Sequence, residues 1–219
     1  MKISTVVFDL DGTLMDTLQD LAESTNYALR EYGFPQHSLE AVRSFVGNGV
    51  RKLIERALPQ GEENPLFEDV FRTFKEHYVA HCRDHSGLYA GIADMLQTLS
   101  DTGYQLAVVS NKLQKGVTEL QHSYFSSWIK VAVGERPEVR RKPAPDMVLQ
   151  AIRELEADLR ETVYVGDSDV DIETARQCGI PCISVLWGFR DREFLETCGA
   201  AHFAATPQDI IQLIRRGLE

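Results

Sequence analysis

The chain has 219 residues, 43% of them hydrophobic and 26% charged, which is typical of a folded globular protein and too apolar for intrinsic disorder. This length allows one large domain or a core with a smaller inserted domain. Acidic residues outnumber basic ones by 33 to 23, giving a formal net charge of −10. Broad electrostatic binding to nucleic acid or to an anionic membrane is therefore not expected.

The first residues lead directly into a strand-like segment, without the long apolar stretch and cleavage site of a secretory signal. No apolar run approaches the roughly 18 residues that a membrane span needs. We therefore expect a cytoplasmic protein. In that reducing compartment, cysteines without a C-x-x-C spacing are expected to stay reduced and to have no catalytic role. These cysteines are Cys82, Cys178, Cys182 and Cys198.

The first predicted element is an apolar strand at residues 6–8, and the segment that follows it has a different pattern. Between residues 16 and 85 strand-like runs are absent, and proline and glycine divide the stretch into several predicted helices. We therefore expect a helical domain at 16–85, inserted into a core made of residues 1–15 and 86–219. The apolar residues that recur there at helical spacing include Leu18, Leu21, Ala22, Phe67, Val70, Phe71 and Phe74.

Four further strand-like runs follow the predicted insert, at residues 106–109, 131–133, 163–165 and 183–186. They are apolar on both faces, and helix-like stretches separate them. This alternation predicts an α/β protein with a doubly wound, Rossmann-like parallel sheet that helices cover on both faces.

Polar residues follow three of the predicted strands, and these residues indicate where a ligand would bind. Asp9 follows the first strand, Ser110 and Asn111 follow the second, and Asp167 comes one residue after the strand at 163–165. Open parallel sheets bind ligands beyond the carboxyl ends of their strands. We therefore expect these side chains to converge on one crevice.

Asp9 and Asp11 form a closely spaced pair of carboxylates, and Gly12 allows the backbone to turn beside them. Two such carboxylates repel each other unless a cation binds between them or one is protonated. With a hard divalent metal, one could act as a nucleophile and the other as a general acid and base. Alone, the pair could equally cap a turn or a helix.

The motif at Asp9 to Leu14 resembles the first motif of the haloacid dehalogenase superfamily of phosphotransferases. Further resemblances follow in order: Ser110 is similar to the second motif, Lys142 to the third, and the segment from Gly166 to Asp171 to the fourth. Each residue taken singly has a structural alternative, such as a helix cap or a solvated charge. The ordered set makes coincidence a poor explanation.

The resemblance implies specific roles for the acidic residues. Asp9 is expected to attack phosphorus and form an aspartyl-phosphate, while Asp11 protonates the leaving alkoxide and then deprotonates water. Mg²⁺ is the implied cofactor. Its implied ligands are the Asp9 and Asp167 carboxylates and the Asp11 backbone carbonyl, and Asp171 is expected to orient them.

The resemblance also implies how a phosphate would be bound. Ser110 and the backbone amide of Asn111 are expected to contact phosphate oxygens, and Lys142 to place its charge beside both the nucleophile and the phosphate. The implied partner is a small phosphorylated metabolite, not a nucleic acid or a membrane. The sequence does not indicate an oligomeric state.

The predicted insert is similar to the C1 cap of bacterial phosphoglycolate phosphatases, which makes 2-phosphoglycolate the leading substrate. Asn48 and Arg51 in this insert are candidate specificity residues, because an arginine there could pair with a substrate carboxylate. The alternative for Arg51 is an ordinary surface charge. His77, His81 and His85 could line one helix face as metal ligands, although a solvated face is the simpler interpretation. Trp128 and Trp187 are expected to be packing residues.

Several related functions remain open at this point. A pyrophosphatase, a nucleotide or sugar phosphatase and a phosphomutase would share most of these motifs. A dehalogenase or phosphonate hydrolase is disfavoured by Asp11, because those enzymes lack an acid at that position. A non-catalytic sensor of phosphorylated ligands is a further alternative. The basic segment at 136–141 would favour a more highly charged substrate if it faced the crevice, although a solvated loop is the simpler reading.

Overall fold

The computed structural model describes residues 2–218, and it divides the chain into two compact units. The first unit contains the chain up to Leu14 and from Leu88 onward, and the second is Met15–Gly87. The chain leaves the first unit and returns to it through β2 (Met15–Asp16) and β3 (Gly87–Leu88), which pair as a two-stranded sheet.

The first unit is built on a six-stranded sheet in the order β5-β4-β1-β6-β7-β8, in which every pairing is parallel. This confirms the predicted α/β class. Because the strands are parallel, their carboxyl ends share one edge of the sheet, and Phe8 at the end of β1 pairs with both Val108 and Val165. The strands are β1 (Thr5–Phe8), β4 (Gln105–Leu113), β5 (Val131–Glu135), β6 (Thr162–Gly166), β7 (Cys182–Val185) and β8 (His202–Ala204).

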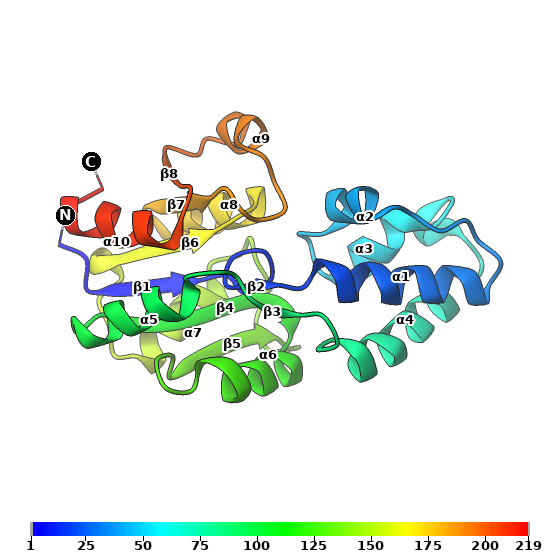
Figure 1. The fold of residues 1–219 in the computed structure, drawn as a ribbon, viewed down its shortest axis with the longest axis horizontal. Coiled ribbons are helices and arrows are strands. Elements are labelled where there is room, and N and C mark those ends of the chain that lie inside the picture. Colours follow the sequence, from blue (N-terminus) through cyan, green and yellow to red (C-terminus); the bar gives the residue numbers. More distant parts are fainter. Residues whose placement is uncertain (1, 219) are drawn as a thin grey trace. The chain divides into compact units, whose positions relative to one another are not determined.

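Helices cover both faces of this sheet (Figure 1). On one face, Met147 and Ala151 of α7 and Ala175 of α8 pack in one buried cluster with Val7 and Val109 of the sheet. On the other face, α5 and α10 contact each other. The helices of this unit are α5 (Ile92–Asp101), α6 (Gln114–Leu120), α7 (Asp146–Glu154), α8 (Asp169–Cys178), α9 (Arg192–Thr197) and α10 (Pro207–Arg216).

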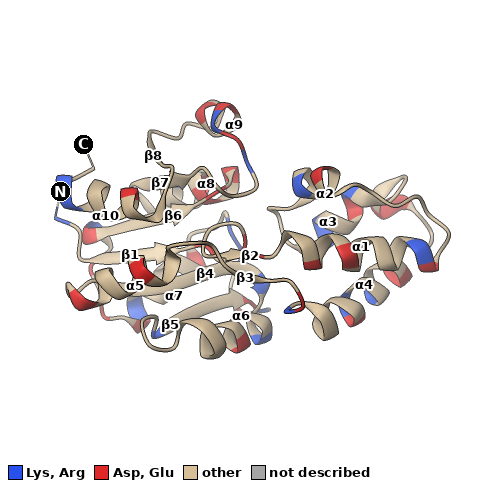
Figure 2. Ribbon diagram, in the orientation of Figure 1, with Lys and Arg blue, Asp and Glu red and all other residues tan. Residues whose placement is uncertain are grey.

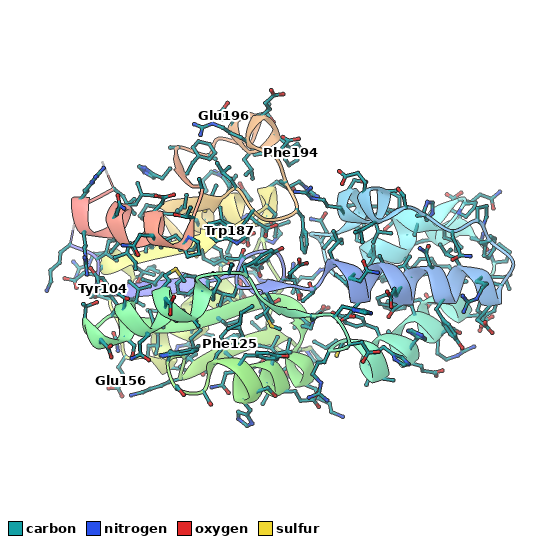
Figure 3. The ribbon with its side chains drawn as sticks, viewed as in Figure 1. Tyr104, Phe125, Glu156, Trp187, Phe194 and Glu196 are labelled. Atoms are coloured by element: carbon teal, nitrogen blue, oxygen red, sulfur yellow. The ribbon has the colours of Figure 1, made fainter. Side chains whose placement is uncertain are left out.

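Local sequence signals explain where several of these helices begin and end. A capping box starts α10, where Thr206 and Asp209 satisfy each other's backbone N–H groups and Pro207 occupies the first turn. A left-handed Gly179 ends α8. The helix α6 continues as a π-helical turn at Gln121–Phe125. The side chain of Phe125 at the end of this turn is fully buried, whereas that of Phe194 on α9 is 40% exposed (Figure 3).

The second unit is helical, with α1 (Leu18–Glu31), α2 (Leu39–Phe45), α3 (Val50–Ala57), a 3-10 turn at Gly61–Glu63 and α4 (Phe67–His81). The helices α1 and α4 pack together and bury apolar residues such as Leu21, Leu29 and Phe74. Asp20 is also buried, and its carboxylate accepts hydrogen bonds from the backbone N–H groups of His85 and Ser86 and from the Ser86 hydroxyl. These bonds tie the end of the unit to the start of α1.

Charged residues are distributed over both units. Lys and Arg are interspersed with Asp and Glu along the helices, whereas the strands of the large sheet are mostly uncharged (Figure 2). No disulfide joins the four cysteines. Among the described residues, no helix combines the length and the apolar character of a membrane span.

Candidate active site

The predicted carboxylates meet at the carboxyl edge of the large sheet. Asp9 directly follows β1, Asp167 directly follows β6, and Asp171 lies in the first turn of α8. All three are buried. Within residues 2–218 they form the one group of three potential metal ligands of this kind, with one ligand oxygen from each lying within 4.8 Å of the others.

Lys142 lies at the centre of this group, although its loop between β5 and α7 is far away in the sequence. Its ammonium donates hydrogen bonds of 2.7 Å to Oδ1 of Asp9, 2.7 Å to Oδ1 of Asp171 and 3.0 Å to the Tyr164 hydroxyl. Lys142 is only 4% exposed. An ammonium with three oxygen partners satisfies each of its donors without water, which offsets the cost of burying the charge.

Burial and charge act in opposite directions on these groups. Burial raises the pKa of Asp9 well above its usual value, and the Asp171 and Asp167 charges add to this, while Lys142 opposes it. Burial alone would lower the pKa of Lys142, but Asp171, Asp9 and Tyr164 outweigh it and hold that pKa well above its usual value. The ammonium therefore stays charged through the whole physiological range.

Asp167 is held from several sides. Its Oδ1 accepts a hydrogen bond of 3.3 Å from the Thr13 hydroxyl, and its Oδ2 accepts one of 2.7 Å from the backbone N–H of Phe189. Burial and the neighbouring Asp171 raise the pKa of Asp167 to about 7. A Cβ added at Gly12 or at Gly188 would lie 2.5 Å from Oδ2 of Asp167, so both positions require glycine for close backbone approach.

Asp171 is fixed by the turn that starts α8. Its Oδ2 accepts hydrogen bonds from the backbone N–H groups of Asp167 and Ser168 and from the Ser168 hydroxyl, and Ser168 and Asp171 form a capping box. Because Lys142 occupies Oδ1, both Asp171 oxygens already have hydrogen-bond donors. This carboxylate is thus suited to orienting its neighbours.

The donor set fits a hard divalent cation. Asp9 and Asp167 supply buried carboxylate oxygens at the carboxyl edge of the sheet, and oxygen is the ligand that Mg²⁺ prefers. Both carboxylate oxygens of Asp171 already accept hydrogen bonds, so this residue fits a role in orienting the other side chains better than direct ligation of the metal. The structure thus brings Asp9, Asp167 and Asp171 together, and the roles of Asp9, Asp167 and the Asp11 carbonyl as metal ligands stay predictions.

Ser110 and Asn111 lie inside β4, and the strand is longer than the sequence predicts. The predicted run ends at residue 109, but β4 continues to Leu113, with a shift in its pairing to β5 between Val109 and Leu113. Side-chain oxygen and nitrogen of Asn111 bond to the backbone N–H and carbonyl of Lys142, at 2.9 and 3.0 Å. Asn111 thus positions Lys142, a contact that sequence reasoning missed.

Two further residues of the site were not predicted. Tyr164 occupies the middle of a strand that reads as purely apolar, yet its hydroxyl accepts a hydrogen bond from Lys142. Lys112 directs its ammonium to Asp11, at 3.1 and 3.3 Å from the two carboxylate oxygens. Neither could be recognised locally, because tyrosine is common in buried strands and lysine is common at strand ends.

Asn48 and Arg51 both lie in the second unit, and the contacts described for them are within that unit. Arg51 donates to Glu62 at 2.8 Å and to Glu68 at 2.6 Å, and its guanidinium lies over the Phe67 ring. Oδ1 of Asn48 accepts a hydrogen bond from Arg56. A substrate carboxylate would therefore have to compete with two glutamates for Arg51.

The three candidate histidines belong to the second unit. On α4, His77 and His81 stack at 4.3 Å, and His77 Nδ1 lies 3.0 Å from the Ser24 hydroxyl. His85 lies beyond the end of α4 at His81, so the three histidines do not share one helix. In the described part of the chain they form no three-residue metal group.

The two tryptophans and the basic segment at 136–141 also make specific polar contacts in the structure. Trp128 and Trp187, expected as packing residues, both donate indole hydrogen bonds, and that of Trp187 reaches the Thr13 carbonyl at 3.0 Å. Trp187 thereby fixes the turn that follows the Asp9 motif, and it lies on the segment after β7 (Figure 3). Within the basic segment, Arg140 pairs with Asp146 at the start of α7.

The fold and the acidic site define a class of enzyme. The sequence profile of the haloacid dehalogenase-like hydrolases matches residues 6–185, and the chain belongs to this family. This confirms the resemblance that the ordered motifs predict.

Individual relatives narrow the comparison. The chain is 31% identical over 218 residues to the phosphoglycolate phosphatase of Mesorhizobium japonicum, covering 96% of each chain. It is 32% identical over 187 residues to that of Aquifex aeolicus, covering 84% of this chain and 85% of the relative. A candidate phosphoglycolate phosphatase from Lactobacillus delbrueckii subsp. bulgaricus, solved by crystallography, matches with a TM-score of 0.94 and 33% identity over 98% of this chain and 99% of its own. The chain is thus a phosphoglycolate phosphatase-like hydrolase.

Proposed function

We propose that this protein is a Mg²⁺-dependent phosphatase that hydrolyses a small phosphomonoester, with 2-phosphoglycolate as the leading substrate, through an aspartyl-phosphate intermediate. The observation that carries the proposal is the Lys142 ammonium, which lies between Asp9 and Asp171 beside Asp167. This arrangement gives Asp9 a fixed orientation and places positive charge where a phosphate dianion would bind. The phosphoglycolate phosphatases among its relatives support the choice of substrate.

Asp9 is the proposed nucleophile. Its Oδ1 is bound by Lys142, which fixes the plane of the carboxylate. A carboxylate oxygen of Asp9 forms the new bond to phosphorus, and the bond from phosphorus to the leaving oxygen breaks. Asp11 gives a proton to that oxygen, then takes one from the water that attacks the aspartyl-phosphate and releases inorganic phosphate.

Other residues of the site bind the phosphoryl group and stabilise its charge. The Ser110 hydroxyl and the Asn111 backbone amide are proposed to donate to phosphate oxygens, and Lys142 offsets the charge that develops during transfer. Asp9, Asp167 and the Asp11 carbonyl would hold Mg²⁺, with Asp171 orienting them. When bound, the ion supplies further positive charge to the phosphoryl oxygens and reduces repulsion between the carboxylates.

The stabilisation of the protein by Mg²⁺ is expected to grow with pH. The raised pKa of Asp167, about 7, means that in the metal-free protein this carboxyl stays mostly protonated at pH values below about 7. Stability from this group is complete below its ordinary value of 3.8 and falls as pH rises through about 7. Mg²⁺ binds the carboxylate and restores stability, so the difference in melting temperature between Mg²⁺ and chelator should be larger at pH 8 than at pH 5.5.

Two substitutions provide the comparison for this experiment. Asp167→Asn should remove most of the Mg²⁺-dependent difference at both pH values. Asp158→Asn is the matched control, because Asp158 is an exposed partner of Arg160 outside the acidic group. An Mg²⁺ effect that is equal at the two pH values, or larger at pH 5.5, would contradict the assignment of Asp167 as a ligand.

The reaction and the substrate are tested by the same steady-state screen. Purified protein is assayed with Mg²⁺ or chelator against 2-phosphoglycolate, sugar phosphates, nucleotides, pyrophosphate and a phosphomutase substrate. The proposal expects release of inorganic phosphate only with Mg²⁺, and the highest kcat/KM for 2-phosphoglycolate. Binding of a phosphorylated ligand without turnover would instead indicate a sensor, and a better nucleotide or pyrophosphate substrate would change the substrate assignment.

Arg51→Ala is expected to lower kcat/KM for 2-phosphoglycolate while sparing an aryl phosphate without a carboxylate. Loss of a desolvated charge pair costs about 2 to 5 kcal/mol, and the existing pairs of Arg51 with Glu62 and Glu68 place the expected effect at the lower end. The matched control is Arg72→Ala, which removes an exposed arginine of α4 from the same unit. If kcat/KM falls equally for both substrates, or falls for neither, Arg51 is an ordinary surface charge and not a specificity residue.

A further inference from the structure

Lys112 contacts the proposed general acid and base directly. Its ammonium lies 3.1 Å from Oδ1 and 3.3 Å from Oδ2 of Asp11, so a single donor group faces both oxygens of the carboxylate. The Lys112 side chain is 8% exposed and the Asp11 side chain 20% exposed. This ion pair is therefore largely shielded from solvent, unlike the surface pairs of the chain, and its geometry is restricted.

The backbone and stem of Lys112 are also constrained. Its backbone N–H donates to the Ser110 hydroxyl at 3.2 Å, which links Lys112 to a proposed phosphate-binding residue. A Cβ added at Gly116 in α6 would lie 3.6 Å from Cε of Lys112, so the lysine stem passes close to that helix. The low exposure of the side chain and its ion pair limit the rotamers of Lys112, and a fixed ammonium in turn limits those of Asp11.

We infer that Lys112 is a positioning residue for Asp11, an inference that rests on the proposed function. The carboxyl of Asp11 must reach the leaving oxygen in one step and the attacking water in the next, although it lies at a turn and is partly exposed. The paired ammonium holds it in one place for both steps. The two lysines thus bind different carboxylates of the site. The Lys142 ammonium donates hydrogen bonds to Asp9 and Asp171, and the Lys112 ammonium donates to Asp11.

The test compares phenyl phosphates whose leaving groups differ in their need for a proton. Phenolate needs a proton from Asp11 as its bond to phosphorus breaks, whereas nitrophenolate departs as a stable anion. Because kcat/KM reports the steps up to that departure, Lys112→Met should lower it for phenyl phosphate by about 10- to 100-fold, part of the roughly 10²- to 10⁴-fold that general acid catalysis contributes. For nitrophenyl phosphate the fall should stay within about twofold, because little proton donation remains to be lost.

Two further variants make the result specific. Lys115→Met is the matched control, since Lys115 is an exposed lysine three residues further along the chain in α6, and it should leave both substrates unchanged. Lys112→Arg keeps the charge and should recover part of the loss. In an Asp11→Asn background, Lys112→Met should cause no further fall, because the residue that it positions is already disabled.

Each outcome bears on one proposal only. An equal fall of Lys112→Met on both substrates, no fall, or a further fall in the Asp11→Asn background would overturn the positioning role, and an equal fall would assign Lys112 to phosphate binding. If Lys112→Met does not fold, the same comparison is made with Lys112→Arg and Lys112→Gln. If the wild type hydrolyses neither phosphate with Mg²⁺ present, it is the proposed function that fails.

Discussion

Asp9→Asn is expected to reduce turnover to the uncatalysed background while the protein remains folded. The amide has nearly the shape of the carboxylate and can still accept the hydrogen bond from Lys142, but it cannot act as the nucleophile. Phosphate release is measured with saturating Mg²⁺ and 2-phosphoglycolate, and unfolding is followed by circular dichroism. Acid quenching during turnover should trap labelled phosphate on the wild-type chain and none on the variant.

The matched control for Asp9→Asn is Asp158→Asn, which makes the same chemical change at an exposed residue of the first unit. It should retain wild-type turnover. Turnover by Asp9→Asn within about tenfold of the wild type, equivalent to only about 1.4 kcal/mol in the barrier, would refute Asp9 as the nucleophile.

Lys142→Met is expected to destabilise the protein and to inactivate it. The substitution leaves the Asp9 and Asp171 carboxylates buried without their shared ammonium, and removing one partner of a buried ion pair costs about 3 to 5 kcal/mol. The loss should be smaller at pH 5 than at pH 8, because the pKa of Asp9 is already raised and protonation at pH 5 reduces the repulsion. Urea unfolding at the two pH values measures this difference.

Lys115→Met is again the control, since it removes an exposed lysine and should change the unfolding free energy by less than about 0.5 kcal/mol. Lys142→Arg keeps a charge, but its planar guanidinium cannot match the three-way geometry of the ammonium. A Lys142→Met variant as stable as the wild type at pH 8 would show that the carboxylates are relieved in another way.

Much of the site follows from strand direction alone. Asp9 and Asp167 directly follow buried parallel strands, so the convergence of these two side chains is predictable from the alternation of strands and helices. Lys142 is different, because its loop has no periodic pattern, and only the resemblance to the family connects it with Asp9. The contacts of Asn111 with Lys142 span 31 residues and leave no local signal in the sequence.

Some features could not be predicted because they depend on tertiary contacts. The short edge strand β8 contains only three residues and was missed, and the extension of β4 through Ser110 to Leu113 depends on an irregular pairing with β5. Arg51 pairs with glutamates that lie 11 and 17 residues away. Asn48 and Arg51 therefore remain predicted specificity residues, as do the boundaries predicted for the helical cap at 16–85.

The close packing of Gly12 and Gly188 against Asp167 has a consequence for attempts to redesign this enzyme. No side chain fits at either position without displacing the carboxylate, so the surface beneath the acidic group offers no room for variation. New specificity would have to be introduced from residues on the substrate's side of the carboxylates. A library that randomises the whole sheet edge would therefore contain many inactive variants, because Gly12 and Gly188 accept almost no substitution.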